Sequence, residues 1–146
     1  MTDATVRTDV LISIHPEHIP HIIDRTKDHE FRKYQIPGTV RRMWLYETSP
    51  VSALRYCVVV GPARVPGELR VDELSISRNA EFQSGELSEK RLAFYAYKIL
   101  ELHELDSPQS LATLIGQGWA KGAPQRFQYC RIEMLTALEL GLKRKF

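Results

Sequence analysis

Two strand-like runs joined by a short polar connection constrain the fold of this chain more than any other feature. Residues 41–47 and residues 54–60 are rich in aliphatic, aromatic and β-branched side chains, which favour strands. Residues 48–52, with the sequence Thr-Ser-Pro-Val-Ser, connect them. The centre of the chain is therefore predicted to be β-structure.

Further strands and helices are predicted on both sides of this pair. The apolar run 10–14 fits a buried strand, and residues 29–34 alternate as a strand does. Pro16 suits the first position of a helix. The remaining predictions are a long strand at 94–105, where the periodicity also fits a helix, an extended segment at 123–129, helices at 111–115 and 131–142, a loop at 61–67, an insertion with some short helix at 71–90, and a flexible stretch at 1–8.

This order of elements predicts the fold class. Short consecutive strands with one early helix favour an α+β fold, here a mixed β-barrel of about five to six strands flanked by helices. A chain of 146 residues fits a single domain, and we expect that domain to span residues 1–146. Its hydrophobic content of 43% is enough for a core of ordinary size.

Composition also limits the classes of function. No apolar run approaches the ~20 residues of a membrane helix, and the first residues lack the apolar region of a signal peptide. We therefore expect an intracellular protein, cytoplasmic or nuclear. The net charge of +2 is small, so nucleic-acid binding would depend on a pocket or a local patch. Cys57 and Cys130 lack metal-like spacing, and Cys57 is expected to be a buried free thiol.

The pattern Lys27-x-x-Glu30-x-Arg32 is the main candidate for a binding site. In a strand, Glu30 and Arg32 share one face and Phe31 lies on the other. An arginine offers a planar fork of donors for a phosphate or a base edge, and a lysine offers a point charge for phosphate. A glutamate accepts a hydrogen bond from an exocyclic amine. The alternative is a set of surface ion pairs worth under ~1 kcal/mol.

The strand 41–47 and the turn after it supply further candidates. Trp44 and Tyr46 share a face, so either ring could stack on a base, or both could belong to the core. The hydroxyls of Thr48, Ser49 and Ser52 could bind a base or phosphate, or only satisfy the backbone of the turn.

Other types of site have little support. His15, His18 and His21 recur at every third residue and would spread over a wide arc of a helix, so three could not easily meet one metal ion. No glycine loop for phosphate follows a strand, and no G-x-S-x-G motif is present. We therefore expect no metal and no cofactor.

Four segments, in this order, resemble the ASCH domains of the PUA-like superfamily. The first three are Ile-Ser-Ile-His-Pro-Glu at 12–17, Lys-x-x-Glu-x-Arg at 27–32 and Trp-Leu-Tyr-x-Thr-Ser-Pro-Val-Ser at 44–52. The fourth is a later segment in two parts, 97–100 and 123–129. The resemblance implies a barrel with a cleft lined by the second segment, in a superfamily viewed mostly as RNA- or DNA-binding modules, some of which read modified bases. A minority are amidohydrolases that act on acetylcytidine and carry a threonine nucleophile three residues after the lysine. Glu30 stands there in this chain.

The resemblance and the residues together predict a module that binds RNA or single-stranded DNA in a cleft. The expected site residues are Lys27, Glu30, Arg32, Trp44, Tyr46, Thr48, Ser49 and Ser52. One alternative is a hydrolase of a modified nucleoside, with Lys27 as the base and Glu30 as its partner. A second alternative is a protein-interaction domain that uses the apolar face of the last helix. The oligomeric state stays open.

Overall fold

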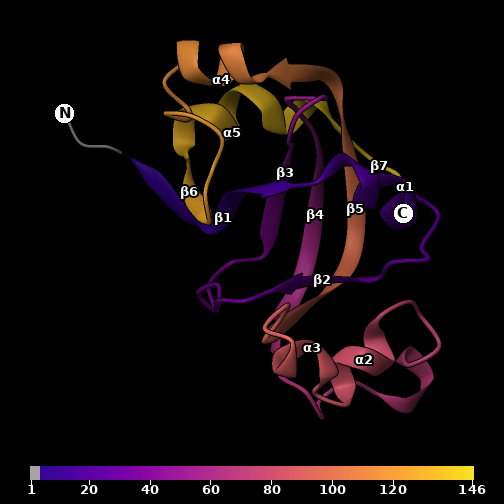
Figure 1. Ribbon diagram of the computed structural model, residues 1–146. Helices are drawn as coiled ribbons and strands as arrows, with labels where there is room; N and C mark the ends of the chain where they lie inside the picture. Colours follow the sequence, from indigo (N-terminus) through magenta and orange to yellow (C-terminus); the bar gives the residue numbers. More distant parts are fainter. Residues whose placement is uncertain (1–3) are drawn as a thin grey trace.

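The computed structural model describes residues 4–146, and its centre is a seven-stranded mixed sheet (Figure 1). The strand order is β2-β5-β4-β3-β1-β6, and β7 pairs with β5. Only the β1–β3 pair is parallel among the described pairs. The strands are β1 (Thr5–Ile14), β2 (His29–Arg32), β3 (Arg42–Glu47), β4 (Ala53–Arg64), β5 (Tyr95–Ser110), β6 (Phe127–Arg131) and β7 (Leu142–Arg144).

Five short α-helices, formed within residues 4–146, lie around the sheet. Helix α1 follows β1, helices α2 and α3 lie at one end of the molecule, and helices α4 and α5 lie at the opposite end (Figure 1). Helix α4 begins where the Ser110 hydroxyl accepts a hydrogen bond from the Thr113 amide at 3.1 Å. The helices are α1 (Ile19–Ile23), α2 (Asn79–Gln83), α3 (Glu86–Glu89), α4 (Leu111–Gly116) and α5 (Ile132–Leu138), with 3₁₀ turns η1 (Pro16–His18), η2 (Val71–Glu73) and η3 (Glu139–Gly141).

The central strands bury both of their faces, which explains their continuous apolar sequences. Successive side chains of a strand point to opposite faces of the sheet. One face carries a cluster that α1 covers, and the other carries a cluster that α4 and α5 cover. The first cluster includes Val10, Ile12, Ile22, Met43, Leu45 and Val58, and the second includes Leu11, Trp44, Tyr46, Cys57, Leu114, Met134 and Leu135.

The sheet is open, so the expected closed barrel is not what forms. Strands β2 and β6 lie at its two ends and do not pair with each other. Side chains bridge the gap instead of a ladder: the Tyr34 hydroxyl donates to the Arg126 carbonyl at 2.7 Å, and the Tyr34 and Phe127 rings stack at 5.9 Å. The α+β class holds, and the number of strands is seven rather than five or six.

Several predicted boundaries are corrected by long-range pairing. Strand β4 continues to Arg64 through the segment expected to be a loop, because residues 63 and 64 pair with β5 across a register shift. Strand β5 likewise continues to Ser110 instead of ending near residue 107. The last helix stops at Leu138, since the residues after it form η3 and β7.

The stretch expected to be flexible, residues 1–8, is ordered from its second half onward. Strand β1 begins at Thr5, which pairs with Arg131 of β6. Residues 1–3 of that stretch lie outside the described residues. The short helix predicted within 71–90 is confirmed as α2 and α3. Among residues 4–146, no helix is long and apolar enough to cross a membrane.

Candidate functional site

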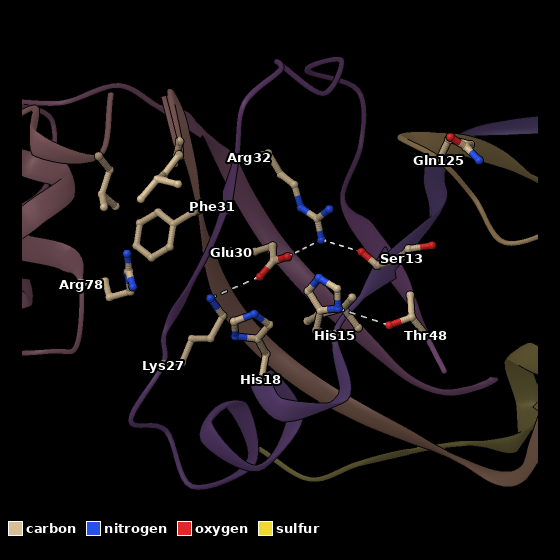
Figure 2. Close-up of a pocket in the computed structure, with 14 residues that line it drawn as sticks. Ser13, His15, His18, Lys27, Glu30, Phe31, Arg32, Thr48, Arg78 and Gln125 are labelled. Carbon is tan, nitrogen blue, oxygen red and sulfur yellow. Dashed lines mark hydrogen bonds and ion pairs between the residues drawn. The ribbon is translucent and has the colours of Figure 1, made fainter. Parts of the chain in front are cut away.

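A cavity of about 420 Å³ lies beside strand β2 (Figure 2). The end of β1, the turn η1, the strand β2 and the insertion between β4 and β5 all contribute to its wall. This volume falls in the range of ~300–1,000 Å³ that is usual for small-ligand sites. Its lining residues divide into a polar group, Ser13, His15, His18, Lys27, Glu30, Arg32, Thr48, Arg78 and Gln125, and an apolar group, Ile14, Phe31, Leu87, Leu92 and Ala93.

The carboxylate of Glu30 lies between two cations in this cavity (Figure 2). Lys27 Nζ is 3.4 Å from Glu30 Oε1, and Arg32 Nη2 donates to Glu30 Oε2. The side chains of Lys27, Glu30 and Arg32 are only 13%, 7% and 18% exposed. The structure therefore brings together the three residues that the sequence pattern singled out, in a largely desolvated arrangement.

The two cations keep the carboxylate of Glu30 charged. Burial by itself raises the pKa of Glu30, but Arg32 and Lys27 outweigh burial and lower that pKa below its usual value. Burial likewise disfavours the charged form of Arg32, and the Glu30 carboxylate reverses this and raises the pKa of Arg32. At neutral pH Glu30 is thus a hydrogen-bond acceptor only.

Arg32 also joins two strands that do not pair with each other. Its Nη2 donates to the Ser13 carbonyl of β1 at 2.8 Å as well as to Glu30. Both hydrogens of Nη2 are therefore used inside the protein. The Tyr34 hydroxyl also interacts with the Arg32 side chain and, like Glu30, raises the pKa of Arg32.

Phe31 lines the same cavity, although it projects from the opposite face of β2. Strand β2 is the last strand of the sheet and pairs only with β5, so side chains from both of its faces reach the space beside its free edge. Lys27 Nζ lies 5.1 Å from the centre of the Phe31 ring, within cation–π range. The ring packs against Phe82 of α2 with centroids 5.4 Å apart.

Trp44 and Tyr46 are core residues, which removes them as candidates for stacking on a base. Their exposed fractions are 0% and 2%. The Trp44 indole donates from Nε1 to Asp9 Oδ2 at 2.8 Å, inside the cluster that α4 and α5 cover. Their face of β3 is covered by helices from the C-terminal half of the chain, so no ring face is left for a ligand. Among the described aromatic side chains, Phe31 lines the cavity in their place.

The three hydroxyl candidates of the turn after β3 separate in space. Thr48 lines the cavity, and its Oγ1 is 3.4 Å from His15 Nδ1. Ser49 and Ser52 do not line the cavity. The Thr48 carbonyl accepts hydrogen bonds from the Val51 and Ser52 amides at 3.1 and 3.3 Å, which closes the turn. Of the three hydroxyl candidates, Thr48 alone therefore belongs to this site.

Two of the three histidines reach the cavity. His15 and His18 line it, with ring centroids 6.3 Å apart, and His21 lines a neighbouring cavity. Burial, together with the nearby Lys27 charge, lowers the pKa of His18, so its imidazole is neutral at pH 7. The ring of His18 is therefore a neutral donor or acceptor at the edge of the site.

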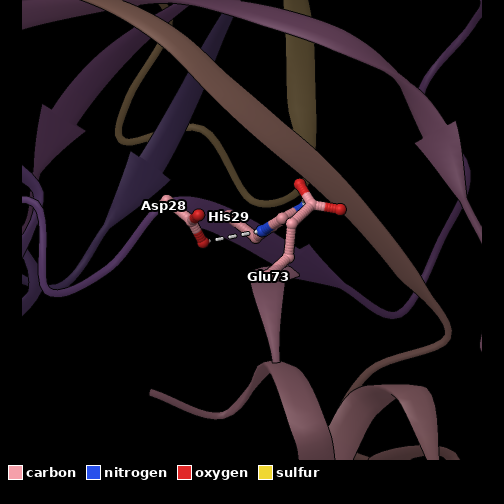
Figure 3. Close-up of side chains that lie close together, drawn as sticks. All are labelled: Asp28, His29 and Glu73. Carbon is pink, nitrogen blue, oxygen red and sulfur yellow. Dashed lines mark hydrogen bonds and ion pairs between the residues drawn. The ribbon is translucent and has the colours of Figure 1, made fainter. Parts of the chain in front are cut away.

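Asp28, His29 and Glu73 form a group of possible metal ligands, within 4.8 Å of one another (Figure 3). Their ligand atoms already have partners. His29 Nδ1 is 2.8 Å from Asp28 Oδ1, and Arg64 Nη1 is 3.2 Å from His29 Nε2 and 2.8 Å from Glu73 Oε1. Lys98 Nζ bonds the other Glu73 oxygen. Arg64 and Lys98 therefore occupy the ligand atoms of His29 and Glu73, and their positive charges would repel a metal ion at this position.

This ion-pair network holds the insertion 65–93 against the sheet. Although burial raises the pKa of Glu73, hydrogen bonds from Lys98, the Arg70 amide and Arg64 lower it to about 2. Asn79 Nδ2 donates to Asp28 Oδ1 at 2.8 Å and to the Glu73 carbonyl at 2.9 Å. The wall of the cavity that the insertion supplies therefore has a fixed position.

Sequence reasoning missed the cavity residues that come from distant segments. Phe31 lies on the opposite face of β2 from Glu30 and Arg32, as alternation predicted, and was therefore not counted among the site residues. Gln125 and the insertion residues Arg78, Leu87 and Leu92 carried no local signal. They meet the Lys27–Glu30–Arg32 cluster only because the sheet brings β2 next to β5 and the insertion that precedes it.

Comparison with known proteins identifies the fold. No protein-family model and no curated protein matches the sequence. Among solved structures, a crystal structure of a serine-to-alanine mutant of an ASCH protein from Zymomonas mobilis superposes with a TM-score of 0.66, and covers 92% of this chain and 99% of that chain at 18% identity. This chain has an ASCH-like fold.

Two further crystal structures of the Zymomonas mobilis ASCH protein agree. The unmutated protein gives a TM-score of 0.60 at 20% identity, covering 91% of this chain and 97% of that chain. A tyrosine-to-phenylalanine mutant gives a TM-score of 0.60 at 19% identity, covering 90% of this chain and 99% of that chain. The ASCH resemblance predicted from four short segments is thus confirmed for the fold of nearly the whole chain.

Proposed function

We propose that this protein binds single-stranded nucleic acid and holds one unstacked base in the cavity beside β2. The observation that carries the proposal is the desolvated Glu30 carboxylate, fixed between Lys27 and Arg32 opposite the Phe31 ring. The ASCH-like fold supports it, because the superfamily consists mostly of nucleic-acid-binding modules.

The polar half of the cavity suits the edge of a base. Glu30 is ionised, so it accepts hydrogen bonds and selects a ligand group that carries N–H donors. Its orientation is fixed by Lys27 and Arg32 before any ligand arrives, which lowers the entropy cost of binding. Thr48 and His18 add a hydroxyl and an imidazole to the cavity wall, and the Ser13 hydroxyl donates to the Pro124 carbonyl at 2.6 Å.

The apolar half suits the face of a base. Phe31, Leu87 and Leu92 supply apolar surface to the cavity wall, and an aromatic side chain stacks on a base with a gain of ~1–3 kcal/mol. A base inside a duplex could not reach such a position without leaving its stack. The proposed ligand is therefore single-stranded RNA or DNA.

The geometry favours recognition over the hydrolase alternative. The Lys27 ammonium is already engaged in an ion pair, with its Nζ 3.4 Å from Glu30 Oε1. Glu30, in turn, is bound by two cations and is a weak base. Incubation with acylated cytidines followed by chromatography tests this alternative, and turnover that disappears in Lys27→Ala would support it.

The protein-interaction alternative keeps only part of its surface. On the last helix, Leu135 and Leu138 are 7% and 8% exposed because they pack against the sheet, and Leu142 belongs to β7. Ile132, on the same predicted apolar face, is 47% exposed. Most of that face is therefore part of the core.

Titration of a labelled 12-nucleotide single strand, as RNA and as DNA, followed by fluorescence anisotropy at low salt, tests the proposal. We expect binding that is tighter than to the duplex of the same sequence. Phe31→Ala should weaken it roughly 5- to 100-fold, which corresponds to the loss of one stacked base. Arg32→Ala should also weaken it, because Glu30 loses its orientation.

Phe94→Ala is a matched control, since Phe94 is 36% exposed and does not line the cavity. Its affinity should equal that of the wild type. Absence of binding by the wild type to both single strands would overturn the proposal. So would equal affinity for duplex and single strand, which would indicate contact with the phosphates alone.

A further inference from the structure

A second cavity, of about 400 Å³, adjoins the first. The two cavities share four lining residues: His18, Lys27, Phe31 and Arg78. The second is also lined by His21, Asp24, Thr26 and Ser77, and the Asp24 carboxylate accepts hydrogen bonds from the Thr26 amide and hydroxyl. The shared residues form the passage between the two spaces, and we refer to them as the bridge.

The charge around the first cavity is not balanced within the protein. Lys27, Arg32 and Arg78 are cations, and Glu30 is the one carboxylate among the residues that line this cavity. The three cations and the one carboxylate leave a net charge of two positive units at this cavity. Glu30 is shared by Lys27 and Arg32, whereas the Arg78 guanidinium has no hydrogen bond or ion pair within residues 4–146.

The backbone holds Arg78 at the bridge in an unusual conformation. Its φ and ψ are 67° and −6°, the left-handed region that costs a residue with a Cβ atom roughly 1–2 kcal/mol. The neighbouring Asn79 is fully buried and bonded to Asp28 and to the Glu73 carbonyl. Those bonds fix the chain on the C-terminal side of Arg78 and keep its side chain beside Phe31 and Lys27 (Figure 2).

We infer that Arg78, together with Lys27, forms a phosphodiester subsite at the bridge, so that the ligand is a strand of at least two nucleotides and not a free nucleoside. One base occupies the first cavity, the phosphate crosses the bridge, and the next nucleotide enters the second cavity. The planar fork of Arg78 suits the oxygens of a phosphate, and the Lys27 ammonium adds a point charge. This inference rests on the proposed function.

The salt dependence of binding measures the subsite directly. Each phosphate contact on a single strand contributes about 0.7 to the slope of log affinity against log salt concentration. For the 12-nucleotide strand, we expect Arg78→Ala to weaken binding about tenfold, as the loss of a charge-assisted hydrogen bond does, and to lower the slope by about 0.7. Arg78→Lys should keep the slope.

Arg91→Ala is the matched control. Arg91 is also exposed and left-handed, with φ 57°, and it lines neither cavity. Its removal takes away the same charge near the site without touching the bridge, so affinity and slope should stay within twofold of the wild type. Arg78→Gly is a second variant, because glycine adopts the left-handed conformation of residue 78 without strain. It should be at least as stable as Arg78→Ala and should bind the single strand as weakly.

An Arg78→Ala slope equal to the wild-type slope, or an equal loss in Arg91→Ala, would overturn the subsite. If Phe31→Ala still weakened binding in that case, the proposed base site would stand without it. A wild type that binds no single strand would overturn both proposals.

Discussion

The buried position of Glu30 predicts that Glu30→Gln lowers the stability of the protein. The substitution keeps the shape of the side chain and removes the charge that Lys27 and Arg32 face. Breaking a buried ion pair by removing one partner costs about 3–5 kcal/mol. The side chains of Lys27 and Arg32 are 13% and 18% exposed, so water screens their charges in part. We therefore expect a loss of unfolding free energy at the lower end of this range, about 3 kcal/mol.

Urea unfolding at pH 7 measures this loss, and thermal unfolding should show a midpoint lower by roughly 6–12 °C. Glu86→Gln is the control, because Glu86 forms a similar pair with Lys90 at 3.3 Å whose side chains are 44% and 61% exposed. That variant should lose at most about 0.5 kcal/mol. Equal stability of Glu30→Gln and the wild type would refute the view that the cluster is desolvated.

The pH dependence gives a second test of the same variant. The pKa of Glu30 is lower in the folded protein than its ordinary value of 4.5, so the unfolded chain takes up a proton first as the pH falls. The stabilisation from its charge is complete above pH 4.5 and is lost as the pH falls through the folded-state pKa. The difference in unfolding free energy between the wild type and Glu30→Gln should therefore shrink on acidification. A difference that stayed constant from pH 7 to pH 3 would contradict the direction of the pKa shift.

Two further predictions test the corrections to the site. Trp44→Phe removes the hydrogen bond to the buried Asp9 carboxylate and should cost about 1.5–3 kcal/mol in urea unfolding, with the affinity for a single strand unchanged; a selective loss of affinity would restore Trp44 as a ligand residue. Glu73→Gln removes the charge that Arg64 and Lys98 share, so hydrogen exchange should speed up in residues 69–90 and not in β3. If residues 69–90 exchanged at the same rate in Glu73→Gln and in the wild type, the network would not be what holds the insertion.

The sequence determined the local part of the site. In a strand, residues two apart share a face, so Glu30 and Arg32 had to lie side by side once β2 formed. Lys27, at the preceding turn, could reach the same carboxylate. Apolar runs such as 10–14 and 54–60 likewise required strands buried on both faces, and the ASCH-like fold could be predicted from four short segments.

The tertiary structure decided what those local patterns could not. Alternation shows that Trp44 and Tyr46 share a face, but only α4 and α5, folded from residues far along the chain, show that this face is covered. Whether a sheet closes depends on hydrogen bonds between its first and last strands, which no local pattern records. Arg78 and Phe31 meet at the cavity because the Glu73 network docks the insertion there. That docking depends on contacts between distant residues, such as Arg64 with His29 and Asn79 with Asp28, which are 35 and 51 positions apart.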